Sequence, residues 1–278
     1  MKKPYRIAIE GIDGSGKSTI IRRMMELIPD HNKEMLVMKC PGYHETPNAP
    51  LQELSSTLYD FSMAADELNC YECKAMALFL QMTLFGSLEH FFSETLKPDI
   101  LVFERHSIIS GLAYGPFYAQ AINPPVDQAT FEPLLKKRLP AFANGDFEQV
   151  FRWIRLESVR LKRPLSFWEY DRYFKEVFSQ GGESMVEAME KWYNTTLPDA
   201  VILLDLPAAT ASARVQERED GGTIELHEAS DTLSLLRERY FKTLNFLNKA
   251  YPHIKTHVVQ AGETKDADEI LSAIIETL

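Results

Sequence analysis

The 278-residue sequence has few cysteines, no long apolar run and fewer basic than acidic residues. Three cysteines are an odd and low number that favours a reducing compartment, so we expect the protein in the cytoplasm. No stretch approaches the roughly 20 uninterrupted apolar residues of a membrane helix. The apolar run near the N-terminus ends at Glu10, which is too early for a signal peptide. A net charge of -10 argues against binding to nucleic acid or to an anionic membrane.

The sequence also contains no internal repeat, no low-complexity segment and no complete zinc motif. Cys70 and Cys73 form a lone CxxC, and no second pair of ligands follows at the spacing of a zinc site. The pattern therefore predicts two buried helical thiols and no metal ion at this place.

Five short apolar runs alternate with longer segments of helical periodicity. The runs are Tyr5–Glu10, Met35–Cys40, Asp99–Glu104, Ala200–Leu206 and Ile254–Gln260. The helical segments are Ser18–Ile28, Glu72–Leu96, Asp231–Asn248 and Asp266–Leu278. Nearly continuous apolar strands that alternate with helices indicate strands buried on both faces of a parallel sheet. The sequence predicts an α/β fold with a doubly wound, five-stranded parallel sheet in one domain, residues 1–278.

Residues 116–190 separate two predicted strands by more than one helix requires, and they are rich in aromatic residues and punctuated by proline. We interpret them as a helical insertion. Basic and aromatic residues interleave over Phe151–Phe174, which fits an enlarged acceptor site or a platform for single-stranded nucleic acid. They also fit helices that pack on their own core or on a second subunit. The acidic composition argues against the nucleic-acid platform.

The strongest motif is GIDGSGKST at residues 11–19, which has the spacing GxxxxGK[ST] between an apolar strand and an amphipathic helix. Glycines let backbone N–H groups surround phosphate oxygens, and the following helix directs its positive end at the anion. Lys17 is expected to reach the β- and γ-phosphates and Ser18 to bind Mg²⁺. The predicted ATP contacts are Gly11, Asp13, Gly14, Ser15, Gly16, Lys17, Ser18 and Thr19, together with Arg214 from a helix further along the chain. The alternative is a tight turn with an incidental lysine.

Glu104 and Arg105 form a second motif at the end of a predicted strand, where open α/β sheets bind their ligands. Glu104 is expected to join the Mg²⁺ shell or to take a proton from the acceptor, and Arg105 to clamp a phosphate. The alternative is a surface ion pair.

A third feature is a predicted helix that carries Arg214 and Arg218 and leads to Gly221-Gly222. Arginines near a glycine-rich hinge suit a lid over ATP, which we place at about residues 214–230. The alternative is a solvated helix face.

The order of these features resembles the thymidylate kinase family. The resemblance is carried by EGIDGSGKST (Glu10–Thr19), VFERH (Val102–His106), LPDAVILLDLP (Leu197–Pro207), RERYFKTL (Arg237–Leu244) and THVVQAGET (Thr256–Thr264). It implies a P-loop fold with a lid, a homodimer, and Mg-ATP-dependent phosphorylation of dTMP to dTDP. It also implies that Asp13 contacts the acceptor's sugar hydroxyl. Because Gly14 leaves the loop without an arginine, the resemblance implies that Arg218, or otherwise Arg214, supplies one from the lid.

The acceptor side departs from that family. Lys39 and Cys40 stand where arginine and glutamate are expected, and Thr83 stands where an arginine contacts the base. Phe79 matches the aromatic residue that stacks on the base. Deoxynucleoside kinases resemble the chain in two other respects: they have a Glu-Arg pair at Glu104, and they have a base-reading glutamine that Gln81 matches.

These residues lead to a main hypothesis and two alternatives. The main hypothesis is a cytoplasmic nucleoside monophosphate kinase that uses ATP and Mg²⁺. Asp13, Lys17, Glu104, Arg105 and Arg218 would be catalytic, Ser18 and Glu104 would hold the metal, and Lys39, Phe79, Gln81, Thr83 and Arg105 would bind the acceptor. The first alternative is a deoxynucleoside kinase, for which Glu45 is the nearest candidate base. The second is a nucleotide-binding module without catalysis.

Overall fold

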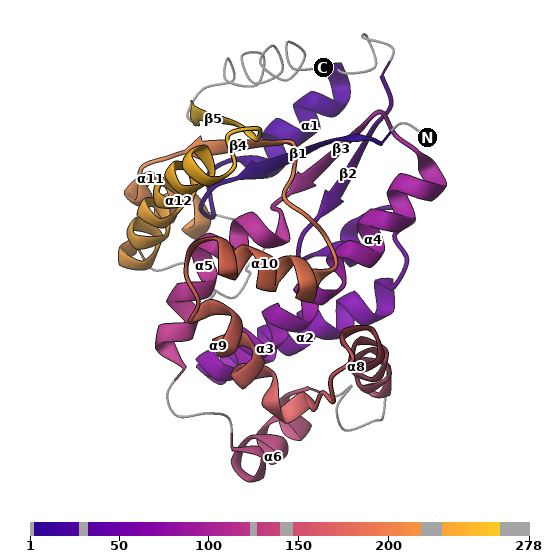
Figure 1. Cartoon of the computed structure of the whole chain (residues 1–278). Coiled ribbons are helices and arrows are strands. Elements are labelled where there is room, and N and C mark those ends of the chain that lie inside the picture. Colours follow the sequence, from indigo (N-terminus) through magenta and orange to yellow (C-terminus); the bar gives the residue numbers. More distant parts are fainter. Residues whose placement is uncertain (1–2, 28–32, 123–126, 140–146, 218–229, 262–278) are drawn as a thin grey trace. The chain divides into compact units, whose positions relative to one another are not determined.

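The structure is a computed structural model that describes residues 3–27, 33–122, 127–139, 147–217 and 230–261 (Figure 1). The chain divides into two compact units. The first consists of Met1–Cys40, Leu88–Ala113 and Thr196–Leu278, and the second of Pro41–Ser87 and Tyr114–Thr195. The assignment of the whole chain to a single kinase domain stays a prediction.

The first unit is built on a five-stranded sheet in which every paired strand is parallel to its neighbour. The strands are β1 (Tyr5–Glu10), β2 (Met35–Lys39), β3 (Ile100–Glu104), β4 (Ala200–Asp205) and β5 (Lys255–Gln260). Their order is β2-β3-β1-β4-β5, with Ile7 opposite Val102 on one side and Ala200 on the other. The predicted α/β fold with five parallel strands is confirmed, and every strand begins and ends within one residue of the prediction.

The apolar runs at the centre of the sheet are buried. All six residues of β4 and the first four of β3 are buried, as expected of central strands covered on both faces. The central strand β1 leads directly into the loop at residues 11–19. Because the chain crosses from one side of β1 to the other between β3 and β4, this loop lies at the switch point where open α/β sheets bind ligands.

Helices flank the sheet of the first unit. Helix α1 (Lys17–Leu27) contacts β1 and β3, and α11 (Ala208–Gln216) packs along α12 (Ser230–Ala250). A π-helical turn, Phe92–Leu96, precedes β3. The predicted helix Asp266–Leu278 lies outside the described residues.

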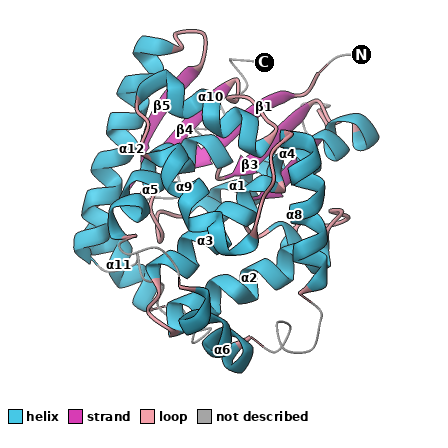
Figure 2. Ribbon diagram, turned by 60° about the horizontal axis from the view of Figure 1, so that its bottom comes forward, coloured by secondary structure: helices cyan, strands magenta, loops and turns pink. Residues whose placement is uncertain are grey.

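The second unit is helical in the residues that the structure describes (Figure 2). It contains η2 (Tyr43–Glu45), α2 (Gln52–Glu67), α3 (Tyr71–Thr83), α6 (Gln128–Arg138), α8 (Glu148–Leu161), η4 (Phe167–Glu169), α9 (Tyr170–Phe178) and α10 (Gly182–Tyr193). Two helices, α4 (Phe85–Phe91) and α5 (Ser107–Ala121), contribute residues to both units. The described part of the predicted helical insertion is therefore helical, whereas α2 was not predicted from the sequence.

Aromatic residues from the insertion and from neighbouring helices form the core of the second unit. The fully buried ring of Phe79 has five aromatic neighbours with ring centroids 5.0–6.3 Å away: Tyr170, Phe174, Phe178, Trp192 and Tyr193. A second cluster joins Phe61, Phe147, Phe151 and Phe167. These edge-to-face and tilted contacts favour the interpretation of the insertion as helices that pack on their own core.

The two cysteines of the CxxC motif lie buried at the start of α3. Cys70 is the N-cap of this helix, and its Sγ accepts a hydrogen bond from the Cys73 N–H at 3.1 Å. The hydrogen bond with Cys70 and burial raise the pKa of the Cys73 thiol. Among the described residues, no cluster of His, Cys, Asp and Glu is suited to hold a metal ion.

Residues 71–96 form the one described helical stretch that is long and apolar enough to cross a membrane by length and composition. Most of it is buried inside the protein, and the core helices of soluble proteins have the same length and composition. The stretch is weak evidence for a membrane span.

Candidate functional site

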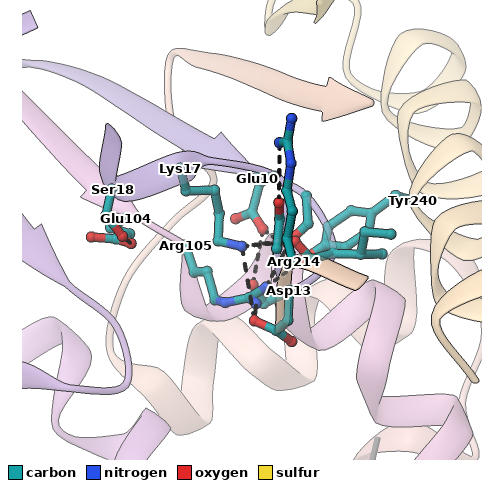
Figure 3. Close-up of polar contacts among 12 residues, drawn as sticks. Glu10, Asp13, Lys17, Ser18, Glu104, Arg105, Arg214 and Tyr240 are labelled. Atoms are coloured by element: carbon teal, nitrogen blue, oxygen red, sulfur yellow. Dashed lines mark hydrogen bonds and ion pairs between the residues drawn. The ribbon is translucent and has the colours of Figure 1, made fainter. Parts of the chain in front are cut away.

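Lys17 is the first residue of α1, and its side chain folds back against the loop that precedes the helix. Its side chain is 8% exposed, and its Nζ donates to the carbonyl oxygens of Gly11 and Ile12 at 3.0 Å each (Figure 3). Asp13 Oδ1 lies 3.9 Å from the same nitrogen. Burial, followed by the nearby Arg105 charge, lowers the pKa of Lys17 to about 8. The loop thus holds an ammonium group that has lost most of its hydration and that a phosphate would stabilise.

The loop is closely packed at Gly14 and open at Gly16. Gly14 has a φ of 80°, and a Cβ at this position would lie 2.5 Å from the carbonyl oxygen of Ala211 in α11. Gly16 has a φ of 91°, and a Cβ there would have no described heavy atom within 4 Å. A side chain at Gly14 would push α11 away, which explains why the loop carries no arginine here. The open space beside Gly16 suits the close approach of a phosphate to the backbone.

Ser15 and Ser18 present hydroxyl groups that fit Mg-ATP. Ser15 Oγ is buried and has no hydrogen-bond partner among the described residues. Buried hydroxyls without a partner are rare, so this oxygen fits a ligand phosphate. The Ser18 hydroxyl donates to Glu104 Oε1 at 2.5 Å, although the two residues are 86 positions apart. A hydroxyl and a carboxylate are hard oxygen donors of the kind that Mg²⁺ prefers. Ser15 therefore fits a phosphate of ATP, and Ser18 with Glu104 fits Mg²⁺.

Arg105 is held in an uncommon backbone conformation with a φ of 69°. Its guanidinium forms an ion pair with Asp13, and Nη1 donates to the Gly11 carbonyl at 3.0 Å and to the Tyr240 hydroxyl at 3.1 Å. Its backbone N–H donates to the Ile9 carbonyl at 3.1 Å. These contacts bring the Glu-Arg motif and the loop together, as the sequence predicted. They also show that the positive charge of Arg105 is paired with Asp13.

Glu10 and Tyr240 belong to this cluster but were not predicted as site residues. The buried Glu10 carboxylate accepts from the His106 N–H at 2.6 Å, Ser110 Oγ at 2.9 Å and the Tyr240 hydroxyl at 3.0 Å. Burial raises the pKa of Glu10 despite these donors. The position directly before the loop was visible in the sequence, but the contact with Tyr240 spans 230 residues and had no sequence signal.

A second unpredicted cluster lies at the carboxyl end of β4. Asp205 receives two hydrogen bonds from Arg237 of α12, at 2.5 and 2.8 Å, and one from Gln260 of β5 at 3.1 Å. The bonds from Arg237, the largest cause, hold the pKa of Asp205 below its usual value. Through these hydrogen bonds α12 is linked to the carboxyl ends of β4 and β5.

The predicted acceptor residues lie on two elements. Lys39 ends β2 and pairs in register with Glu104, so it lies at the carboxyl edge of the sheet near the metal-binding candidates. Phe79, Gln81 and Thr83 are buried on α3 in the second unit. The Thr83 hydroxyl donates to the Leu80 carbonyl at 2.6 Å and accepts from Trp153 Nε1 at 2.8 Å. The amide nitrogen and oxygen of Gln81 are both buried and have no partner in the described part of the chain. Gln81 is thus the acceptor candidate with unused donor and acceptor capacity.

Of the two predicted lid arginines, the structure describes Arg214. It lies on α11, and its Nη1 is 3.5 Å from the Gly14 carbonyl oxygen, next to the loop. Arg218 and most of the predicted lid lie outside the described residues.

Sequence comparison relates the chain to a kinase. No protein-family profile matches the chain. The chain is similar to a uridine kinase of Alkaliphilus metalliredigens (strain QYMF). The two are 23% identical over 223 residues, which cover 78% of this chain and 100% of that protein. This likeness agrees with the fold, which is consistent with that of P-loop kinases.

The affinity for ATP is expected to fall as the pH rises above about 8. Lys17 has a pKa of about 8 in the free protein, and phosphates beside its ammonium would raise that pKa in the complex. Binding then takes up a proton above pH 8, so the affinity should fall by up to about tenfold per pH unit. Titration with a fluorescent ATP analogue between about pH 7 and 9.5 measures this slope. A Lys17→Met variant should bind the ATP analogue weakly, and its affinity should not depend on pH over this range. A wild-type affinity that stays constant over this range would contradict the prediction.

Proposed function

We propose that the protein is a kinase that transfers the γ-phosphoryl group of Mg-ATP to a hydroxyl of a pyrimidine nucleoside. The observation that carries the proposal is the joining of Lys17, Ser18 and Glu104 around one loop. The loop backbone, Ser15 and Lys17 would hold the phosphates. Ser18 and Glu104 would hold Mg²⁺, which supplies positive charge to the transferring phosphoryl group. Such catalysis depends mainly on positioning and electrostatics.

The charge of Arg105 favours an uncharged nucleoside as the acceptor. Its guanidinium is paired with Asp13 and bonded to Gly11 and Tyr240, so it is not organised around a second phosphate. The similarity to a uridine kinase supports the same acceptor class. Gln81 stays the candidate for base recognition, because a buried amide without partners can match the donor and acceptor edge of a pyrimidine.

The second candidate acceptor is a nucleoside monophosphate, with dTMP first. Two observations favour it. Lys39 lies opposite Glu104 in the sheet, where its ammonium could meet an acceptor phosphate. Asp13 lies in the loop, and the resemblance of this loop to that of the thymidylate kinase family implies a contact with the sugar of dTMP. The cytoplasmic location and the homodimer stay predictions under either candidate.

A panel of acceptors separates the candidates. Pyrimidine and purine nucleosides and their 5′-monophosphates are each incubated with Mg-ATP and the protein, and ADP release is measured. We expect turnover with pyrimidine nucleosides and little with monophosphates. Exclusive use of monophosphates, with dTMP preferred, would establish the second candidate instead. Reactions without acceptor and with the Lys17→Ala variant correct for ATP hydrolysis. ATP binding without turnover of any acceptor would contradict both and favour a nucleotide-binding module.

A further inference from the structure

The Tyr240 hydroxyl lies between the two charged side chains of the loop cluster. Tyr240 belongs to α12 and is 1% exposed. Its hydroxyl donates to Glu10 Oε2 at 3.0 Å and accepts from Arg105 Nη1 at 3.1 Å. Figure 3 shows the ring reaching from α12 toward both residues. This contact ties α12 directly to the Glu-Arg motif.

Glu10 fixes the direction in which Tyr240 can act. Each oxygen of this carboxylate is already bonded, Oε1 to the His106 N–H and Oε2 to Ser110 Oγ, so the acceptor for the tyrosine proton is immobile. A tyrosine hydroxyl has one proton. With that proton on Glu10, a lone pair of the oxygen is directed at the guanidinium of Arg105.

Arg105 depends on such contacts to keep its orientation. Its positive φ is an uncommon conformation for a residue with a side chain and persists only where the surroundings enforce it. The Ile9 carbonyl holds its backbone, and Asp13 and the Gly11 carbonyl hold the guanidinium from the loop side. These two partners belong to a loop that would itself contact phosphate. Tyr240 adds a contact from a helix outside that loop.

We propose that Tyr240 is a positioning residue that fixes the guanidinium of Arg105 beside Asp13 for phosphoryl transfer. The proposal rests on the kinase function proposed above. Tyr240 does not touch a reacting atom; it acts through Arg105. Its removal should therefore affect the rate of the chemical step more than the binding of ATP, because Lys17 and the loop glycines remain.

The Tyr240→Phe variant removes the hydroxyl and keeps the ring. We expect kcat with the best acceptor of the panel to fall about tenfold, while the KM for ATP stays within about twofold. The Tyr240→Phe and Arg105→Lys changes should be strongly non-additive, because both remove one interaction. The matched control is Tyr173→Phe, since Tyr173 donates to Glu169 at 2.8 Å in the other unit. This control should lose a similar hydrogen bond and keep its kcat.

A readout independent of turnover is the NMR signal of the Arg105 side-chain Nη1–H, the group that donates to Tyr240, assigned by its loss in Arg105→Lys. In Tyr240→Phe this proton should exchange with water at least about tenfold faster than in the wild type. An unchanged exchange rate, an unchanged kcat or additive effects would each overturn the positioning role. If the wild type turns over no acceptor, the proposed function fails, and the exchange rate alone decides whether Tyr240 orients Arg105.

Discussion

Replacing Lys17 with alanine is expected to lower phosphoryl transfer by about 10³-fold or more, with the fold retained. The side chain is buried in the loop, and its Nζ is bonded to the Gly11 and Ile12 carbonyls. No other described lysine lies in this loop, so the variant should lose the charge that compensates the β- and γ-phosphates. Because the ammonium is held at a desolvation cost, which lowers its pKa to about 8, its removal should cost little stability.

The comparison uses a cation of the same helix that lies away from the loop. Arg23 of α1 is exposed and pairs with Glu26 at 2.9 Å. Arg23→Ala should leave turnover unchanged, which separates an effect of Lys17 from a general loss of positive charge. Circular dichroism and thermal unfolding check that both variants fold. A folded Lys17→Ala protein with wild-type turnover would show that the loop is not the ATP site.

The Lys74→Met variant is expected to destabilise the second unit by about 3–5 kcal/mol. Lys74 Nζ lies 2.5 Å from Asp66 Oδ2, with both side chains at most 1% exposed. Removal of the lysine leaves a carboxylate buried without its cation, whereas the attraction itself is largely offset by desolvation. All three tryptophans of the chain, Trp153, Trp168 and Trp192, belong to this unit. Urea unfolding of the full chain, followed by tryptophan fluorescence, therefore reports on the unit that is changed.

Two further variants test the reason for this loss. Lys136 of α6 pairs with Glu132 in solvent, and Lys136→Met should change the free energy of unfolding by less than about 1 kcal/mol. The double variant Asp66→Leu/Lys74→Met should recover at least half of the loss, because it removes the unpaired buried charge. A loss of less than about 1 kcal/mol for Lys74→Met would show that the pair is not maintained in solution.

The sequence predicted the sheet well, whereas it predicted neither helix α2 nor the first part of α5. Strands such as Ile100–Glu104 are short runs of apolar residues buried on both faces, and such runs are legible without an alignment. Helix α2 was missed because its buried side includes Ser55, Thr57 and Asp66, which weaken the apolar periodicity. Asp66 is buried against Lys74, and the sequence gives no sign of that pairing.

The sequence also predicted candidate residues for ATP binding, but it did not predict the residues that hold them in place. The loop motif predicted Lys17 and Ser18 as site residues, and the strand-end rule predicted Glu104. The fold brings Glu104 Oε1 to 2.5 Å from Ser18 Oγ, and the roles of the three residues stay predictions. Glu10 and Tyr240 were missed because a contact across 230 residues leaves no periodic or spacing signal. On the acceptor half, Phe79 and Thr83 are engaged in the core of the second unit, and Gln81 is the one whose polar atoms have no described partner.

If the loop delivers the γ-phosphoryl group of ATP to a nucleoside-type acceptor, that group must be found on the acceptor after the reaction. The most direct test follows radiolabel from the γ-phosphate of ATP into the acceptor, with wild-type protein, Mg²⁺ and uridine or another pyrimidine nucleoside. We expect labelled nucleotide as the main product, and none with Lys17→Ala. Label that stays in ATP or appears only as inorganic phosphate, with every nucleoside and monophosphate tried, would contradict it.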